Sequence, residues 1–359
     1  MSEVDAILKK ALDGTRLTKE DALLLLEVEG DGILALGAAA SRVRERAVGN
    51  DVTYILNRNI NFTNICTGSC KFCAFRRNAG DADAYFFDIE KIVEMAKEAE
   101  RSGASELCIQ GGLHPDVGID YYTDMLGALK KSVNMHLHAF SPMEIFYASK
   151  KNGHGTKETL ALLREAGLDS IPGTAAEILV ERVRKEICPE KLSAGDWIKV
   201  IKEAHTQGMK TTATMLYGHV ESAEEQVEHL SIIRDIQDET RGFTEFIPLS
   251  FVHFNAPLYL SGGGKEGSTG MDDLKLFAVS RLFLDNFKNI QASWVKLGRK
   301  LSQVALSFGA NDLGGTLVEE NISRSAGIKI DMVTEHELFR IIKSAGKAPV
   351  KRDTVYSHQ

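Results

Sequence analysis

The chain has 359 residues, of which 43% are hydrophobic and 26% are charged, with a formal net charge of -7 and a pI near 5.9. A chain of this length and composition can bury a large core, as one barrel-sized unit or as two ordinary domains. The acidic balance and the scattered basic residues exclude a nucleic-acid-binding stripe, and no apolar run approaches the roughly 18 residues of a membrane-spanning helix. Five cysteines, three of them crowded together, do not form the even framework of a secreted disulfide scaffold. We therefore expect a reducing, cytoplasmic compartment.

The first 50 residues are predicted to be helical, because apolar residues recur at helical spacing from Val4 to Leu12 and Thr18 precedes a leucine-rich helix. We expect these residues, 1–50, to form a helical cap. From Val52 the pattern changes to short β-branched and aromatic runs, typical of a strand that leads into a cysteine-rich loop at 66–73.

After this loop, strand and helix patterns alternate along the chain. Strands are predicted at 105–112, 135–140, 168–173, 210–218, 243–249, 289–295 and 305–315, and helices at 88–101, 120–132, 156–166, 194–207, 223–239 and 272–287. With the strand before the cysteines this makes about eight strand and helix units, as in a parallel (βα) TIM-type barrel of roughly 250 residues. We assign residues 51–330 to this α/β barrel, and residues 331–359 to a short C-terminal helical extension with a helix at 335–344.

An open, doubly wound sheet would show the same alternation. The barrel is favoured because unusual residues stand where strands end, and a barrel gathers the carboxyl ends of its strands on one face, together with the cysteine loop. These residues are Gln110, Gly111, Gly112, His138, Pro172, Gly173, Gly218, Pro248, Asn311 and Asp312. The glycine-rich segment 260–272 is predicted to be a mobile loop.

Cys66, Cys70 and Cys73 form a C-x3-C-x2-C motif. Thiolates favour iron-sulfur clusters or zinc, and both usually take four protein ligands, whereas the local count stops at three. Three thiolates would leave one iron with an open position where a small molecule can bind. A structural zinc site would instead need a fourth ligand, and the nearest possibilities, His114 and Cys108, are more than 30 positions further along the chain.

The cysteine spacing, with Phe72 before the third cysteine, resembles the cluster motif of the radical S-adenosylmethionine enzymes. The resemblance implies a [4Fe-4S] cluster on Cys66, Cys70 and Cys73, with S-adenosyl-L-methionine on the open iron. Reductive cleavage of that cofactor would make a 5'-deoxyadenosyl radical, which abstracts hydrogen from unactivated positions. The resemblance also implies cofactor contacts from Phe72, Gln110, Gly111, Gly112, Glu177, Leu216 and Gly218.

Some of these positions have simpler explanations. The segment from Gln110 to Gly112 could be a plain turn, and Glu177 could be a first-turn glutamate that favours a helix dipole. Thr214 stands where the related adenine motif usually has glycine. Cys108 and Cys188 are expected to be inert core thiols.

Four residues are predicted to bind substrate or take part in catalysis: His138, His253, Asn311 and Asp312. His136 and His138 have the period-two spacing that places both on one side of a strand, and a histidine inside a barrel needs a partner or belongs to a site. His205 and His229 fall on predicted helices and are expected to be solvated.

Longer segments resemble one branch of this superfamily, the CofH-type enzymes, which form the tyrosine-dependent subunit (subunit 2) of FO synthase. They are NRNINFTNICTGSCKFCAF, QGGLHPD, HAFSPMEI, GLDSIPGTAAEIL, TATMLYGHVE, ASWVKLG and GANDLGGTLVEEN, and they cover most of residues 57–322. The resemblance implies a transferase, of EC 2.5.1 type, in deazaflavin (coenzyme F420) biosynthesis. It would cleave L-tyrosine between the alpha and beta carbons and add the 4-hydroxybenzyl radical to 5-amino-6-(D-ribitylamino)uracil. Implied partners are FO synthase subunit 1 and a one-electron donor such as ferredoxin or flavodoxin.

Two alternatives stay open. The futalosine-pathway radical enzymes of menaquinone biosynthesis, dehypoxanthine futalosine cyclase and aminofutalosine synthase, share the cysteine motif, QGGLHP and HAFSP, although SWVKLG and NDLGGTLVEEN favour the deazaflavin enzyme. The chain could instead be an iron-sulfur electron carrier or a structural zinc protein. A carrier would use four protein ligands and need no deep pocket.

Overall fold

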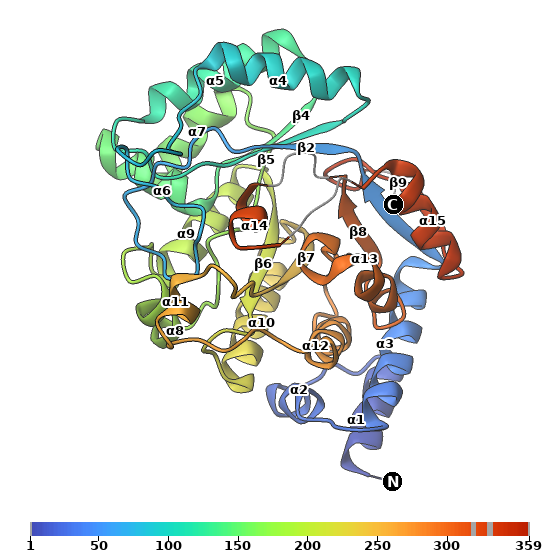
Figure 1. Ribbon diagram of the computed structural model, residues 1–359. Coiled ribbons are helices and arrows are strands. Elements are labelled where there is room, and N and C mark those ends of the chain that lie inside the picture. The colour runs from blue at the N-terminus through green and yellow to red at the C-terminus, as the bar shows by residue number, and fades with distance from the viewer. Residues whose placement is uncertain (1, 317–320, 329–332, 358–359) are drawn as a thin grey trace.

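The computed structural model describes residues 2–316, 321–328 and 333–357, and parallel strands surrounded by helices form its centre (Figure 1). Six strands pair in the order β2 (Asn57–Ile60), β3 (Glu106–Ile109), β4 (His136–Ala139), β5 (Ser170–Ile171), β6 (Lys210–Tyr217) and β7 (Phe243–Ser250). A second sheet has the order β8 (Asp312–Gly315), β1 (Asp51–Ile55) and β9 (Ala348–Lys351).

The two sheets are joined on both sides. On one side, β1 and β2 are separated only by Leu56, so one extended segment pairs with β8 and then with β3. On the other side, parallel bridges connect Phe246 to Ile290 and Gln291 to Asp312. The predicted TIM-type barrel is therefore confirmed. The strand predicted at 289–295 is reduced to these two bridging residues, because helix α13 begins at Trp294.

The outer helices follow the strands in the predicted alternation. They are α4 (Ile89–Arg101), α5 (Ile119–Ser132), α6 (Pro142–Asn152), α7 (Thr156–Ala166), α8 (Glu181–Ile187), α9 (Ala194–Thr206), α10 (Ala223–Thr240), α11 (Pro257–Leu260), α12 (Gly270–Phe283) and α13 (Trp294–Ala305). Asp88, the first residue of the helix predicted at 88–101, caps α4 with its side chain, and Thr269 forms a capping box with Asp272 that starts α12. The helix predicted at 272–287 thus begins two residues earlier, and it ends at Phe283.

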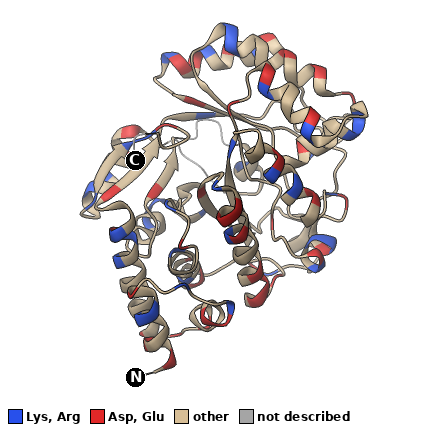
Figure 2. Cartoon of the chain, turned by 180° about the vertical axis from the view of Figure 1, so that it is seen from behind, with Lys and Arg blue, Asp and Glu red and all other residues tan. Residues whose placement is uncertain are grey.

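The N-terminal helices α1 (Glu3–Leu12), α2 (Lys19–Leu26) and α3 (Gly32–Val48) extend this outer layer (Figure 1). Helix α2 packs on α10 and α12, and α3 packs along α12. Leu25 and Leu36 are completely buried in these contacts, so the helices are attached by apolar packing. Figure 2 shows Lys and Arg interspersed with Asp and Glu over the outer helices. None of the helices in the described part of the chain has the length and apolar character needed to cross a bilayer.

The C-terminal segment contributes more than the predicted helix. Helix α15 (Glu335–Ser344) has the predicted bounds, but it is followed by β9, which pairs with β1. The chain then places Arg352 inside the barrel, where its Nε donates to Asp312 Oδ2 at 2.6 Å. The predicted boundary at 330–331 lies outside the described residues, and the division into 1–50, 51–330 and 331–359 stays a prediction.

Two helical histidines are not solvated, contrary to the expectation. His229 on α10 is completely buried, and its Nδ1 accepts a hydrogen bond from the backbone N–H of Leu179 at 3.1 Å. His205 on α9 lies 2.7 Å from Thr240 Oγ1 and 2.9 Å from Thr211 Oγ1. The helical pattern alone does not reveal that these faces point inward, because histidine is common on both buried and exposed faces.

The pH dependence of stability tests the burial of His229. Burial disfavours the charged ring and lowers the pKa of His229 from 6.5 to about 3. Below about pH 6.5 the ring of His229 binds a proton in the unfolded state but stays neutral in the folded state. Lowering the pH therefore lowers the free energy of unfolding of the wild type. A His229→Gln variant has no titrating ring at this position. The free energy of unfolding of the wild type minus that of the variant should therefore shrink by about 2 kcal/mol as the pH is lowered from about 7.5 to 5. Urea unfolding measures this difference, and a constant value would contradict a neutral, buried ring.

Candidate active site

The three clustered cysteines line a cavity of about 260 Å³ at the carboxyl ends of the strands, which we call the cysteine cavity. Its walls include the ends of β3, β6 and β7 and the segments after β4 and β5, through Gln110, Gly111, Gly112, Ser141, Glu144, Thr174, Glu177, Leu216, Leu249 and Phe251. The prediction that strand ends meet the cysteine loop on one face is thus confirmed for Gln110, Gly111 and Gly112.

The donor set of this cavity fits an iron-sulfur cluster. Burial raises the pKa of the Cys70 thiol to about 12, and a bound metal would offset the cost of ionising it there. The backbone N–H of Gly68 donates a hydrogen bond to Cys66 Sγ at 3.4 Å. Each thiolate of a four-iron cluster binds a different iron, so the three sulfurs need not converge on one point.

A single-ion site has less support. His114, a possible fourth zinc ligand, stacks on Phe86 with 4.7 Å between ring centroids, and its Nδ1 accepts a hydrogen bond from the N–H of Asp116. Within residues 2–316, 321–328 and 333–357, no three His, Cys, Asp or Glu side chains are grouped so as to hold one metal ion.

The two glycines after β3 are required by close packing within the chain. A Cβ on Gly111 would lie 2.5 Å from the ring of Phe62, and one on Gly112 would lie 2.3 Å from the carbonyl oxygen of Ile65. The end of β3 is therefore pressed against the segment that leads into Cys66. The glycines fix the position of the cysteine loop as well as lining the cavity.

Replacing Gly112 with alanine should displace the cysteine loop, because the new Cβ would also lie 2.9 Å from Cys66 Cβ. After anaerobic reconstitution we expect the variant to hold less than about half the iron of the wild type. Gly80→Ala is the matched control, since a Cβ there meets nothing within 4 Å. Equal iron content in the two variants would contradict this role of Gly112.

The loop after β5 brings three predicted cofactor residues together. Glu177 is buried and forms an ion pair with Lys191 at 2.6 Å, and the Lys191 ammonium lies 5.1 Å from the centre of the Phe72 ring. The N–H of Leu216 on β6 donates to the Glu177 carbonyl at 3.0 Å. Glu177 lies outside any helix, since α8 begins at Glu181, so the helix-dipole explanation does not apply.

The same loop has an unusual backbone. Ala175 and Glu177 have φ angles of 66° and 46°, in the left-handed region that residues with a side chain rarely adopt. The buried Arg184 supports this shape by donating to the carbonyl oxygens of Ala175, Ala176 and Leu192. Such conformations are held in place by their surroundings and often occur at binding sites. Neither Arg184 nor Lys191 carries a sequence motif that would have identified it.

Glu144 connects β3 to α6 at the cavity wall. Its carboxylate accepts hydrogen bonds from the N–H of Gly111 at 3.0 Å and of Ser141 at 2.7 Å. Burial raises the pKa of Glu144 to about 7, against the lowering effect of these donors. In the sequence, Glu144 is distinguished only by its place shortly after the strand predicted at 135–140.

The contacts of Gly218 and Thr214 explain why glycine and threonine occur at these two positions. Gly218 has a φ of 88° and is not among the residues that line the cysteine cavity; a Cβ there would lie 2.8 Å from the backbone nitrogen of Ser268. Thr214 Oγ1 donates to the carbonyl of Gly173 at 2.8 Å, which accounts for threonine where the related motif has glycine. The cofactor contact predicted for Gly218 stays a prediction.

The four predicted substrate residues do not gather at one place. His253 lines a neighbouring cavity, whereas His138, Asn311 and Asp312 lie inside the barrel and line neither cavity. His136 and His138 do share one side of β4, because both contact Ser170 Oγ at 2.7 Å. Burial lowers the pKa of His138 to about 4, so the ring is neutral near pH 7.

Asn311 and Asp312 are occupied by contacts within the chain. Asn311 Oδ1 accepts from Arg281 at 2.6 Å and from the N–H of Ile290 at 2.9 Å. Asp312 Oδ2 accepts from Thr53 and Arg352 at 2.6 Å each. These bonds give both residues a structural role, and their binding of substrate stays a prediction without support from the geometry.

Comparisons with known proteins agree with this geometry. A family model of the radical SAM superfamily matches residues 60–233, and one of the CofH/MqnC C-terminal region matches residues 240–359. A 5-amino-6-(D-ribitylamino)uracil–L-tyrosine 4-hydroxyphenyl transferase of Methanothermobacter thermautotrophicus is 53% identical over 353 residues, covering 98% of this chain and 96% of that protein. The protein of the same name from Methanocaldococcus jannaschii is 52% identical over 346 residues, with coverage of 95% and 96%.

Solved structures share the fold at low sequence identity. Methylornithine synthase (PylB) superimposes with a TM-score of 0.75 and 19% identity, covering 96% of this chain and 97% of that chain. The FeFe-hydrogenase maturase HydG from Carboxydothermus hydrogenoformans gives a TM-score of 0.76 and 15% identity, with coverage of 99% and 81%. The similarity extends over the barrel and both terminal segments.

Proposed function

The chain belongs to the CofH-type family of radical S-adenosylmethionine enzymes, and on that premise we propose that it is a 5-amino-6-(D-ribitylamino)uracil–L-tyrosine 4-hydroxyphenyl transferase. It transfers the 4-hydroxybenzyl portion of L-tyrosine to the ribitylaminouracil, which is the FO synthase reaction of deazaflavin biosynthesis. The observation that carries this conclusion is the identity of 53% over 98% of the chain with a protein of that name. The futalosine-pathway alternative is not favoured.

The cofactors of this family are a [4Fe-4S] cluster and S-adenosylmethionine, which together supply a 5'-deoxyadenosyl radical when bound. We propose that Cys66, Cys70 and Cys73 hold the cluster and leave one iron without a protein ligand. Gln110, Gly111, Gly112, Glu177 and Leu216 would bind the cofactor from the cavity walls, together with Phe72.

The remaining residues of the cavity position these groups and limit access of water. Lys191 neutralises Glu177 and rests on Phe72, so the cofactor-facing side chains are held in one arrangement. Phe75, Leu216, Leu249 and Phe251 give the cavity apolar walls, which exclude water from a reactive intermediate.

We further propose two partners: FO synthase subunit 1, which would take up the product, and a one-electron donor such as ferredoxin or flavodoxin, which would reduce the cluster. The five cysteines are free thiols in the structure, which is consistent with the expected reducing, cytoplasmic compartment.

Substrate omission tests this function. Reduced, reconstituted enzyme should form an adduct only when both L-tyrosine and the ribitylaminouracil are present, and 5'-deoxyadenosine should accumulate with it. Mass spectrometry measures both products. Turnover of a futalosine-pathway substrate without any tyrosine-dependent product would overturn the assignment.

A further inference from the structure

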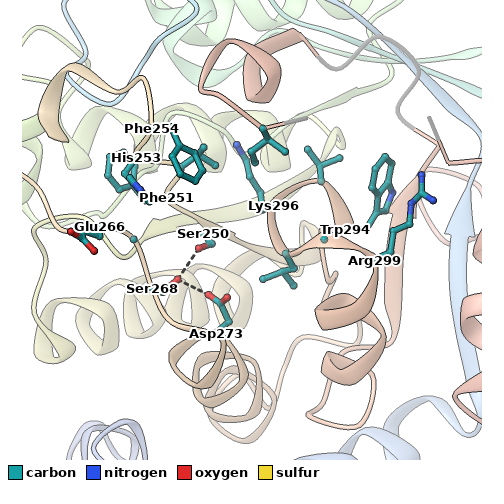
Figure 3. A pocket seen from close by; sticks show the side chains of 16 residues that line it. Ser250, Phe251, His253, Phe254, Glu266, Ser268, Asp273, Trp294, Lys296 and Arg299 are labelled. Carbon is teal, nitrogen blue, oxygen red and sulfur yellow. Dashed lines mark hydrogen bonds between the residues drawn. The ribbon is translucent and has the colours of Figure 1, made fainter. Parts of the chain in front are cut away.

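A second cavity, of about 410 Å³, lies beside the cysteine cavity. Figure 3 shows the side chains that line it. It is bounded by the end of β7, the loop before α12 and the start of α13, and we call it the β7 cavity. The two cavities share Phe251, Val252 and Lys296 in their walls. A molecule in the β7 cavity would therefore lie next to whatever occupies the cysteine cavity.

One wall of the β7 cavity is a connected set of hydroxyl groups around a buried carboxylate (Figure 3). Ser250 Oγ and Ser268 Oγ are 2.7 Å apart, and Ser268 Oγ donates to Asp273 Oδ1 at 2.6 Å. Tyr217 donates to the same oxygen at 2.7 Å. Asp273 is only 5% exposed, and both donors reach Oδ1, which leaves Oδ2 for a ligand.

This polar wall is held in place by the close approach of two backbone segments, at Gly218 and at Ser268. Gly218, at the end of β6, admits the loop that carries Ser268, since a Cβ on Gly218 would lie 2.8 Å from the Ser268 nitrogen. Asp273 is in the first turn of α12, next to the capping box of Thr269 and Asp272. The carboxylate is thus positioned by its contact with the loop that carries Ser268 and by the start of α12.

Phe251, His253 and Phe254 form an aromatic side of the cavity, and Trp294 lies apart from them at its other end (Figure 3). Phe251 and Trp294 are almost fully buried, and the ring of His253 lies 4.2 Å from that of Phe254, measured between centroids. Phe254 is 58% exposed, so part of an aromatic surface faces the opening. Rings of this kind pack well against a planar heterocycle.

We propose that the β7 cavity binds the acceptor, with Asp273 holding the ribityl chain of 5-amino-6-(D-ribitylamino)uracil; this inference rests on the proposed function. A polyol presents neighbouring hydroxyl groups, which donate to a carboxylate in charge-assisted hydrogen bonds and exchange hydrogen bonds with serine hydroxyls. The uracil ring packs against the aromatic side. Tyrosine has no polyol chain, so the row of Ser250, Ser268 and Asp273 suits the acceptor better.

Binding of two related ligands tests this proposal. The reconstituted full-length enzyme is dialysed anaerobically against 5-amino-6-(D-ribitylamino)uracil or 5,6-diaminouracil, which lacks the ribityl chain. Asp273→Asn should weaken binding of the ribityl compound by about 10- to 100-fold, the range expected for lost hydrogen bonds to a charged group, while the affinity for diaminouracil and for L-tyrosine is unchanged. Asp124→Asn, on the exposed face of α5, is the control with the same change in charge.

Three results would overturn the inference: a loss of tyrosine affinity in place of acceptor affinity, an equal loss for both uracils, or no change. If Asp273→Asn does not fold, as judged by thermal unfolding, Ser250→Ala decides, and it should lower the preference for the ribityl compound several-fold. Failure of the wild type to bind the ribitylaminouracil at all would instead count against the proposed function.

Discussion

Replacing Cys70 with alanine should remove the cluster and abolish cofactor cleavage, whereas replacing Cys188 should do neither. Cys70 is one of only three thiolates available on the cysteine loop, and two thiolates do not hold a four-iron cluster. Cys188 lines the same cavity and is 2% exposed, so it is matched to Cys70 in place and chemistry. Iron content, the electron paramagnetic resonance spectrum of the reduced protein and 5'-deoxyadenosine formation measure the outcome.

The Cys188 variant also tests the open iron. If Cys188 were a fourth ligand, its loss would change the spectrum and S-adenosylmethionine could not occupy that position. Equal damage from both substitutions would therefore argue for a closed, four-cysteine cluster of the kind found in electron carriers. Cofactor cleavage that survives the loss of Cys70 would contradict the radical mechanism.

Removing Arg352 should be the most destabilising single change in the barrel interior. Its guanidinium is 4% exposed and neutralises Asp312, which is completely buried, and Glu245, at 3.4 Å. Arg352→Met would leave these carboxylates without their cation, and breaking a buried pair in this way costs about 3–5 kcal/mol. Denaturant unfolding measures the loss.

Arg16→Met is the control for this prediction. Arg16 pairs with Asp238 and Asp285 at the surface, where its side chain is 45% exposed, and such pairs contribute about 1 kcal/mol or less. Burial raises the pKa of Glu245 to about 7, so lowering the pH should neutralise this carboxyl group and reduce the cost of Arg352→Met. Equal losses for the two arginine variants would contradict a buried network.

The sequence was sufficient for the barrel and the cysteine cavity because both follow from local patterns. Alternating strands and helices require a parallel sheet, and a parallel barrel brings Gln110, Gly111 and Gly112 to the cysteine loop. The helix predicted at 335–344 is present with those bounds.

The remaining contacts depend on residues that are distant in the sequence. Nothing near Arg352 indicates that it enters the barrel to meet Asp312, 40 positions earlier. The strand predicted at 305–315 is only Asp312–Gly315 in the structure, because helix α13 continues to Ala305, so Asn311 and Asp312 stand at its start and not at its end. Their side chains are engaged by Arg281 and Arg352. Lys191 and Asp273 were missed because a single charged residue in a helix or loop is usually solvated.

The central claim is the transfer of the tyrosine ring system to the ribitylaminouracil. The most direct measurement supplies reduced enzyme with ring-labelled L-tyrosine, S-adenosylmethionine and 5-amino-6-(D-ribitylamino)uracil, and analyses the products by mass spectrometry. We expect the intact label in an adduct with the uracil, together with 5'-deoxyadenosine, and neither product in the Cys70→Ala variant. Formation of 5'-deoxyadenosine with no label in any uracil product would contradict the account.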